Sequence, residues 1–260
     1  MPDSDSNYIH NSHKRYPDGT QVLIEFRKPF KITINPQKPR KKHREPLALY
    51  LIRADSRAKT TIKDLIKSNT FDHFITFTFD PAKLPYRYDA DMCKVAIQKW
   101  FKSQTRKYGR FDYIVLPEFH KNGALHFHAV FGGFKGPLAD SGVRHGGNIV
   151  YNLPTYRLGF STAKIIKQSP EDRDRVASYL TKYVTKDMPH FAGKKRYFTS
   201  SDLKRPVKTT NWQIDNLGQQ LRYIVRRRQL TWENEHCKVY RIPPDENDEK
   251  SVGKIDNSLP

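Results

Sequence analysis

The chain has 260 residues, enough for one domain of ordinary size with tails or for two small domains. Lysine and arginine number 47 against 27 acidic residues, a formal charge of +20 that favours a polyanionic partner such as nucleic acid, although charge alone does not exclude a merely soluble basic protein. No stretch is apolar for long enough to cross a bilayer, and the N-terminus has no apolar signal region. The two cysteines, Cys93 and Cys237, are too few for a disulfide framework or a thiolate zinc site, so we expect a reducing cytoplasm.

The N-terminal segment, residues 1–45, is predicted to be a flexible basic arm. Its segment "KPRKKHR" is a cationic run flanked by prolines. This run is either a solvated linker or a phosphate-binding segment without sequence preference, in which Lys41, Lys42 and Arg44 would contact DNA. A compact domain is expected over residues 46–206, and a C-terminal extension over residues 207–260.

The expected domain mixes strands and helices. Aromatic and β-branched residues predict strands over residues 71–80, 111–118, 125–131 and 160–167, and an Asn-Gly pair predicts a hairpin turn between the second and the third. A helix is predicted over residues 89–109, with Asp89 or Asp91 as N-cap and Gly109 as C-cap. The glycine-rich residues 132–147 are predicted to form a loop. A last helix is predicted from the N-cap Ser169 to Pro189.

The segment "GALHFHAVF" places two histidines in an otherwise apolar strand. Side chains alternate in a strand, so His126 and His128 share one face, while Phe127 and its apolar neighbours can pack on the other. The pair either packs as a surface feature or binds one metal ion. Glu118 would join them if the hairpin loop around Asn122 has an odd number of residues, because it would then lie opposite His126.

A strict two-residue turn would instead pair Glu118 with Phe127 and remove the carboxylate from the site. His120 is then the alternative ligand. With either turn, Glu118 could also be no more than an exposed carboxylate at the end of a strand.

The segment "YLTKYVTK" combines two phenols with two ammonium groups. In a helix, Tyr179, Lys182, Tyr183 and Lys186 have the spacing of one face. This face is either a solvated lysine surface on which the tyrosines lie flat, or a nucleophile site in which a tyrosine attacks phosphorus and a lysine offsets negative charge.

In order and spacing, these motifs resemble those of HUH endonucleases that start rolling-circle replication, closest to the initiators of small single-stranded DNA phages, of the isometric gene A type and the filamentous type. "FITFTF" resembles the first motif of that family, and "PEFHKNGALHFHAVF" resembles the second, with Glu118 as the acid before the histidines. "YLTKYVTK" resembles the third. A basic block after the last helix, "GKKRYFTSSDLKRP", is also similar, and it contains the DNA-contact candidates Lys194, Lys195 and Arg196.

The resemblance implies an α+β fold with a central antiparallel sheet flanked by helices, related to the RNA-recognition-motif fold and here bearing basic N- and C-terminal extensions. It implies a metal site with Mg²⁺ or Mn²⁺ held by Glu118, His126 and His128, and catalysis by the residues of the tyrosine helix. The reaction nicks single-stranded or supercoiled origin DNA, joins a tyrosine to the 5′ phosphate and leaves a 3′ hydroxyl for synthesis. No Walker-type phosphate loop is present, so a host helicase and a host polymerase are the expected partners, in the cytoplasm of an infected bacterium.

Two other functions stay open from the sequence. The first is a plasmid mobilisation relaxase or a transposase of the same superfamily, although single-tyrosine transposases fit less well because both tyrosines are present. The second is a non-catalytic nucleic-acid-binding module, for which the aromatic strand "FITFTF" would also be suitable.

Overall fold

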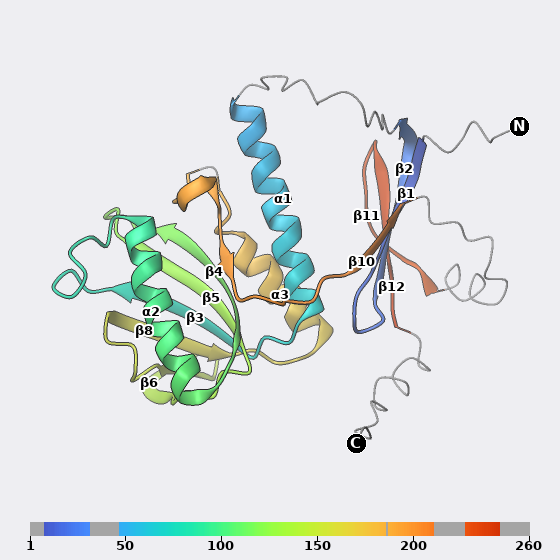
Figure 1. The fold of residues 1–260 in the computed structure, drawn as a ribbon. Helices are drawn as coiled ribbons and strands as arrows, with labels where there is room; N and C mark the ends of the chain where they lie inside the picture. Colours follow the sequence, from blue (N-terminus) through green and yellow to red (C-terminus); the bar gives the residue numbers. More distant parts are fainter. Residues whose placement is uncertain (1–7, 32–46, 186, 211–226, 245–260) are drawn as a thin grey trace, which may run out of the picture. The chain divides into compact units, whose positions relative to one another are not determined.

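The structure is a computed structural model, and it describes residues 8–31, 47–185, 187–210 and 227–244 (Figure 1). Over these residues the fold is α+β, with α-helices and two antiparallel sheets, which confirms the predicted fold class. The chain divides into two compact units, residues 44–204 and residues 1–43 together with 205–260. None of the described helices combines the length and the apolar character needed to cross a membrane.

The unit of residues 44–204 is built on a seven-stranded sheet in the order β6-β7-β8-β3-β5-β4-β9. Its strands are β3 (His73–Phe79), β4 (Asp112–Phe119), β5 (Leu125–Gly132), β6 (Ala139–His145), β7 (Asn148–Asn152), β8 (Gly159–Ile165) and β9 (Phe198–Thr199). Its helices are α1 (Leu47–Ser68), α2 (Ala90–Tyr108) and α3 (Pro170–Thr181), followed by a 3₁₀ turn at Ala192–Lys194. The four predicted strands are confirmed as β3, β4, β5 and β8.

The prediction of a loop over residues 132–147 is wrong, because β6 lies within it. β6 is the edge strand of the sheet, and it pairs with β7 through a register irregularity between Asp140 and Arg144. Nearly all of its side chains are exposed. A strand that buries neither face has no alternating apolar pattern, so the sequence carries no strand signal here.

One face of the seven-stranded sheet packs against α2 (Figure 1). The Asp89 carboxylate caps this helix by accepting hydrogen bonds from two backbone N–H groups of its first turn, and Gly109, with φ +93°, ends it. The apolar cluster on this face joins side chains of β3 and β5 to the buried face of the helix and includes Phe77, Phe127, Phe131, Trp100 and Phe101. This aromatic cluster is the larger part of the core.

The opposite face packs against α1 and α3. The shared cluster contains Ile114, Leu116 and Val130 from the sheet, with Ile62, Leu65 and Ile66 from α1 and Ala177 and Leu180 from α3. The side chain of Ser169 accepts a hydrogen bond from the Asp172 N–H at 3.1 Å, which confirms the predicted N-cap of α3. This face is only partly apolar, and its polar part holds the site described below.

Helix α3 is shorter than predicted, because it ends at Thr181 instead of continuing to Pro189. The Thr181 hydroxyl lies 2.8 Å from the Ala177 carbonyl and 3.1 Å from that of Ser178. The N–H groups of residues 182–184 then bond to carbonyls three residues earlier, at 3.1–3.3 Å. The backbone therefore tightens from α-helical to 3₁₀-type turns after a residue whose side chain competes for helix carbonyls.

The second unit contains a five-stranded sheet in the order β10-β1-β2-β12-β11. Its strands are β1 (Tyr8–Arg15), β2 (Gln21–Lys31), β10 (Val207–Thr210), β11 (Gln229–Glu233) and β12 (Cys237–Ile242). Residues 8–31 are therefore a strand pair where a flexible arm was predicted. Two strands of the C-terminal extension, β10 and β12, pair with them, and β11 pairs with β12. The turn at 17–19, in which Gly19 has φ +80° and the Asp18 carboxylate accepts a hydrogen bond from the Thr20 N–H, is the hairpin signal in this segment.

Candidate functional site

The β4–β5 hairpin brings Glu118 to the histidines. Glu118 lies directly opposite His126 in the register, and five residues, 120–124, connect the two strands. The loop closes through a 2.8 Å hydrogen bond from the His120 N–H to the Ala124 carbonyl, and Gly123 adopts φ +79°. The predicted odd-length loop is confirmed, and so is the shared side of Glu118 and the histidines.

His128 lies between two polar partners. Its Nε2 is 2.6 Å from Oε2 of Glu118, and its Nδ1 is 3.3 Å from Oγ1 of Thr76 on β3. The imidazole is only 8% exposed, whereas the Glu118 side chain is 42% exposed. The hydrogen bond from His128 holds the pKa of Glu118 below its ordinary value, so the carboxylate is ionised at neutral pH.

His126 makes a different contact from that of its strand neighbour. Its ring stacks on His120, with centroids 4.7 Å apart and an angle of 14° between the planes. Burial, together with the neighbouring imidazoles of His120 and His128, lowers the pKa of His126, so its ring is neutral at neutral pH. A neutral imidazole is the form that binds a metal.

Both tyrosines of the third motif lie at this cluster. The ring of Tyr183 stacks on His128, with centroids 3.7 Å apart and planes within 9° of parallel. Tyr179 meets Tyr183 edge to face at 5.6 Å and meets Phe74 of β3 at 5.2 Å, while 44% of its surface stays exposed. Burial, and a hydrogen bond with Tyr179, raise the pKa of Tyr183 well above its ordinary value. The two phenols therefore differ in exposure.

The lysines of this motif are less closely attached. The Lys182 ammonium lies 5.4 Å from the centroid of the Tyr179 ring, within the range of a cation–π contact. Lys182 itself is exposed at the C-terminal end of α3. The predicted role of Lys186 falls outside the described residues. The structure thus places one of the two predicted lysines beside a tyrosine ring.

Glu118, His126 and His128 are the candidate ligands for a divalent ion. Among the described residues, no group of three or more His, Cys, Asp or Glu side chains is arranged to hold an ion. Glu118 and His128 point their ligating atoms at each other, and His126 lies on the same face of the sheet. The carboxylate is a ligand that suits Mn²⁺ and Mg²⁺, and neutral imidazoles are common ligands of divalent transition-metal ions, so the residues fit a divalent ion in chemical kind. Binding would replace the direct Glu118–His128 hydrogen bond.

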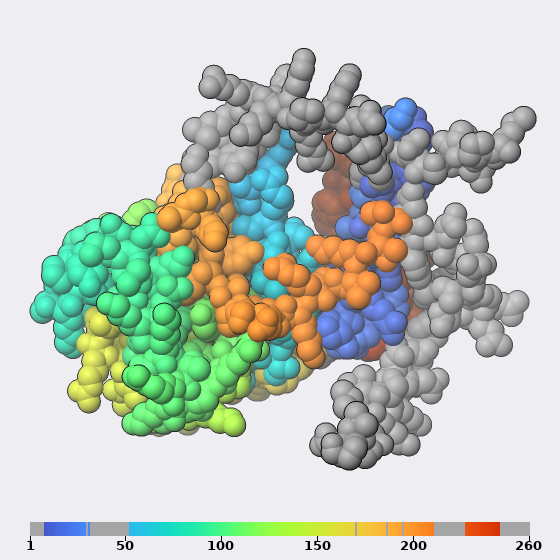
Figure 2. All heavy atoms as spheres, in the orientation of Figure 1, coloured from blue at the N-terminus to red at the C-terminus, as the bar shows by residue number. Residues whose placement is uncertain are grey.

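The predicted DNA contacts have mixed outcomes. Lys41, Lys42 and Arg44 lie outside the described residues, as does the side chain of Lys194, while Lys195 is exposed. The prediction that Arg196 contacts DNA is wrong, because this residue is 5% exposed and forms an ion pair with Asp55 of α1. The ion pair joins the segment after α3, which is orange in Figure 2, to α1.

Two residues of the site were missed from the sequence. Thr76 lies opposite His128 in the pairing of β3 with β5, and Phe74 supports Tyr179. The alternation in "FITFTF" places both side chains on one face, which is a usable signal. The register with β5, which brings Thr76 to the imidazole, has no local signal in the sequence.

Residues 72–188 match the model of the family described as replication-associated protein ORF2/G2P. The matched segment starts just before β3 and ends after the tyrosine motif, so it contains every residue of the site. Comparisons with curated proteins and with solved structures found no match to the chain. The segment that carries the site is therefore similar to replication-associated proteins of the ORF2/G2P family, which is consistent with initiation of rolling-circle replication.

Proposed function

We propose that the chain is a metal-dependent single-strand DNA endonuclease and strand transferase that nicks a replication origin through a phosphotyrosine intermediate. The observation that carries the proposal is the parallel stack of the Tyr183 ring on the His128 ring. The Nε2 atom of the same imidazole contacts the Glu118 carboxylate. A phenol held against an imidazole–carboxylate pair joins a nucleophile to the groups that a phosphodiester reaction needs. The match of this segment to replication-associated proteins supports the same role.

In the proposed reaction, a tyrosine oxygen attacks the phosphorus of the scissile phosphodiester. The new bond joins the tyrosine to the 5′ phosphate, the bond to the 3′ oxygen breaks, and the phenol proton leaves while the 3′ oxygen gains one. The free 3′ hydroxyl can prime synthesis, or it can attack the phosphotyrosine and rejoin the strand. Strand transfer needs no external energy source, because each step exchanges one phosphoester for another.

Glu118, His126 and His128 would hold the divalent ion. When bound, Mg²⁺ or Mn²⁺ supplies positive charge to a scissile phosphate that otherwise repels nucleophiles. The protein residues position the phenols and keep water from the buried side of the stack. Lys182, beside the Tyr179 ring, adds a second positive charge near the attacking oxygen.

The two tyrosines differ, and we assign the first cut to Tyr179. It is the more exposed phenol and lies beside Lys182, whereas the raised pKa of Tyr183 makes that phenol harder to ionise in the free protein. The second tyrosine then cuts the regenerated origin while the first still holds a strand. This assignment explains why a replication initiator would keep two phenols on adjacent turns.

The test is incubation of the protein with labelled single-stranded oligonucleotides from the cognate replicon, with and without Mn²⁺. Tyr179→Phe and Tyr183→Phe should each retain some single cleavage and lose repeated cutting and joining, with the larger loss of the first cut in Tyr179→Phe. The double variant should form no covalent adduct. Mass spectrometry of a trapped adduct in the wild type should identify the peptide of residues 178–186.

Two outcomes would change the assignment. If one single variant lost all cleavage and the other behaved as the wild type, the protein would be a single-tyrosine nickase with a structural second phenol. If no metal-dependent adduct formed with any single strand, a non-catalytic nucleic-acid-binding module would be favoured. The direct Glu118–His128 hydrogen bond is the observation that keeps this alternative in view.

A further inference from the structure

The five-stranded sheet has two unlike faces. One face carries Leu23, Tyr240 and Ile242, which form its small apolar cluster and are at most 9% exposed. Residues directly opposite each other in adjacent strands share a face, and neighbours along a strand take opposite faces. The second face therefore carries Val22, Ile24 and Phe26 of β2, which are half-buried.

The second face combines positive charge with apolar and aromatic side chains. The register aligns one row of residues across the sheet, which consists of Lys208, Lys14, Val22, Arg241 and Gln229. The next row consists of Thr210, Ser12, Ile24, Val239 and Trp232. Trp232 is 53% exposed, so a large aromatic surface faces solvent at the β11 edge of the sheet, with Arg241 on the adjacent strand and Lys14 and Lys208 further across the same face.

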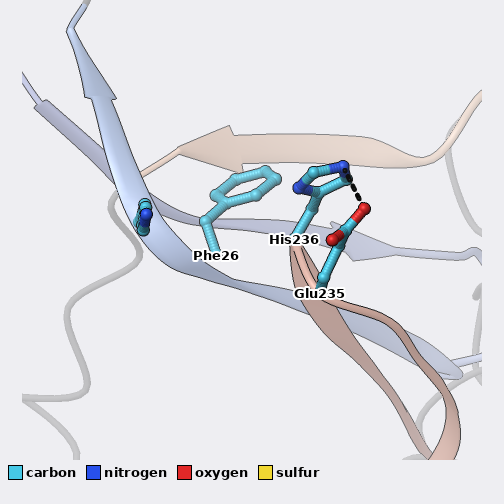
Figure 3. A pocket seen from close by; sticks show the side chains of 4 residues that line it. Phe26, Glu235 and His236 are labelled. Atoms are coloured by element: carbon cyan, nitrogen blue, oxygen red, sulfur yellow. Dashed lines mark ion pairs between the residues drawn. The ribbon is translucent and has the colours of Figure 1, made fainter.

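A pocket of about 320 Å³ lies near the β11–β12 turn, lined by Phe26, Lys28, Glu235 and His236. Figure 3 shows the Phe26 ring close to the His236 ring, with His236 joined to the Glu235 carboxylate by an ion pair of 3.4 Å. The turn is fixed to β2, since Arg27 donates hydrogen bonds to Glu233 and to the Asn234 carbonyl, both at 2.8 Å. In this pocket the two rings can stack on a base, the lysine can pair with a phosphate, and the carboxylate can accept a hydrogen bond from an amino group of a base.

We propose that this face of the five-stranded sheet binds single-stranded DNA, with Trp232 and the Phe26–His236 pocket stacking on bases and the cationic row contacting phosphates. The choice of DNA rests on the proposed function. The described parts of this unit carry eleven lysines and arginines against four acidic residues, which complements a polyanion. A duplex keeps its base faces stacked inside the helix, so exposed aromatic rings favour a single strand. The residues of this surface lie outside residues 72–188, so none of them belongs to the tyrosine site.

The test measures binding of a fluorescently labelled, mixed-sequence single strand to the full chain by anisotropy, in EDTA so that metal-dependent cleavage does not occur. Phe26→Ala and Trp232→Ala should each weaken binding by about 5-fold or more, because each removes a stacking platform. Leu230→Ala is the matched control. Leu230 lies on the same strand as Trp232 and is 50% exposed, but the register shifts between the two residues, so Leu230 pairs with Tyr240 on the other face. The affinity of this variant should therefore stay within about twofold of the wild type.

Wild-type affinity in both aromatic variants would overturn the proposal, and an equal loss for the duplex of the same sequence would overturn the assignment to single strands. If a variant fails to fold, the wild type is instead photo-crosslinked to a halogenated single strand. The crosslinks should lie in peptides of β2 or β11, and crosslinks confined to other segments would contradict the proposal. Cleavage is measured separately with Mn²⁺ on the same preparations. If the wild type never cleaves but its binding depends on Trp232, the proposed nuclease function is rejected and the proposed binding surface is supported. If the wild type cleaves but its binding does not change in the Phe26 and Trp232 variants, the nuclease function is supported and the binding surface is rejected.

Discussion

The two faces of the seven-stranded sheet have different contents although they come from the same strands. The face toward α2 is closed mainly by aromatic side chains, among them Phe77, Phe127 and Trp100. The face toward α1 and α3 is apolar around Ile114 and Val130 but holds His126, His128 and Glu118 further along the same strands. The polar residues there are held by hydrogen bonds and ring stacking instead of by burial alone.

This difference teaches how a small domain can separate stability from chemistry. In β5, adjacent residues take opposite faces, so Phe127 anchors the core while His128 one residue later contacts Glu118 and Tyr183. The rigid aromatic face fixes the strand positions, and those positions fix the imidazoles. Substitutions on the two faces should therefore have separable effects, and four predictions test this separation.

The largest effect is expected from the polar face. His126→Ala or His128→Ala should abolish cleavage, a loss beyond the roughly 10- to 100-fold that removing a supporting hydrogen bond costs metal sites. Binding of single-stranded DNA should be largely unchanged, because the basic surface is intact. Calorimetry should show Mn²⁺ binding by the wild type and its loss in the double variant.

Equal Mn²⁺ binding by the wild type and the double variant would reject the metal site. A large drop in melting temperature in His126→Ala would contradict the separation of the faces, because that half-exposed ring is assigned to chemistry. Circular dichroism melts of the same preparations provide this control.

The next effect is expected from the aromatic face. Phe127→Ala should lower the free energy of unfolding by about 3–5 kcal/mol, since it leaves a cavity in a fully buried cluster. Phe127→Leu should recover much of this loss because it keeps most of the volume. Urea denaturation measures both, and a loss below about 1 kcal/mol for Phe127→Ala would show that this face is not the main source of stability.

Much of the site could be predicted from the sequence because its signals are local. Strand alternation places His126 and His128 on one face, and an odd loop around Asn122 places Glu118 opposite them. The sequence predicted that Tyr183 lies near Tyr179, but it did not predict the position of the Tyr183 ring. The helix ends before it, and a 3₁₀-type turn brings its ring onto His128.

Other parts depend on contacts between distant segments. Arg196 belongs to a basic run that reads as a DNA contact, yet its pairing with Asp55, far away in the sequence, makes it a buried residue. The five-stranded sheet joins residues 8–31 to residues 207–210 and 229–242, and no local pattern indicates that pairing. Helix α1 was not predicted, although its sequence contains a signal: Ala58, Ile62, Leu65 and Ile66 follow helical spacing, and they are buried.

A smaller effect is expected from Thr76, a positioning residue that acts through His128. Thr76→Val keeps the shape of the side chain and removes the hydroxyl near Nδ1 of His128. We expect cleavage to fall about 10-fold while stability changes by less than about 1 kcal/mol. Thr76→Ser should restore cleavage because it restores the hydroxyl, and a Ser variant no better than Val would show that the hydrogen bond does not matter.

The smallest effect is a pH dependence on the polar face. The pKa of His126 lies below its ordinary value of 6.5 in the folded protein, so the unfolded chain binds more protons in the window between the two values. The stability contributed by the neutral ring is present above pH 6.5 and is lost as the pH falls through that window. The free energy of unfolding of His126→Gln should therefore decrease less steeply than that of the wild type on acidification below 6.5, by less than about 1 kcal/mol in total because the ring is only half-buried. Urea midpoints measured from pH 7.5 down to 5 compare the two slopes, and parallel curves would mean that His126 titrates normally and is not held neutral by its neighbours.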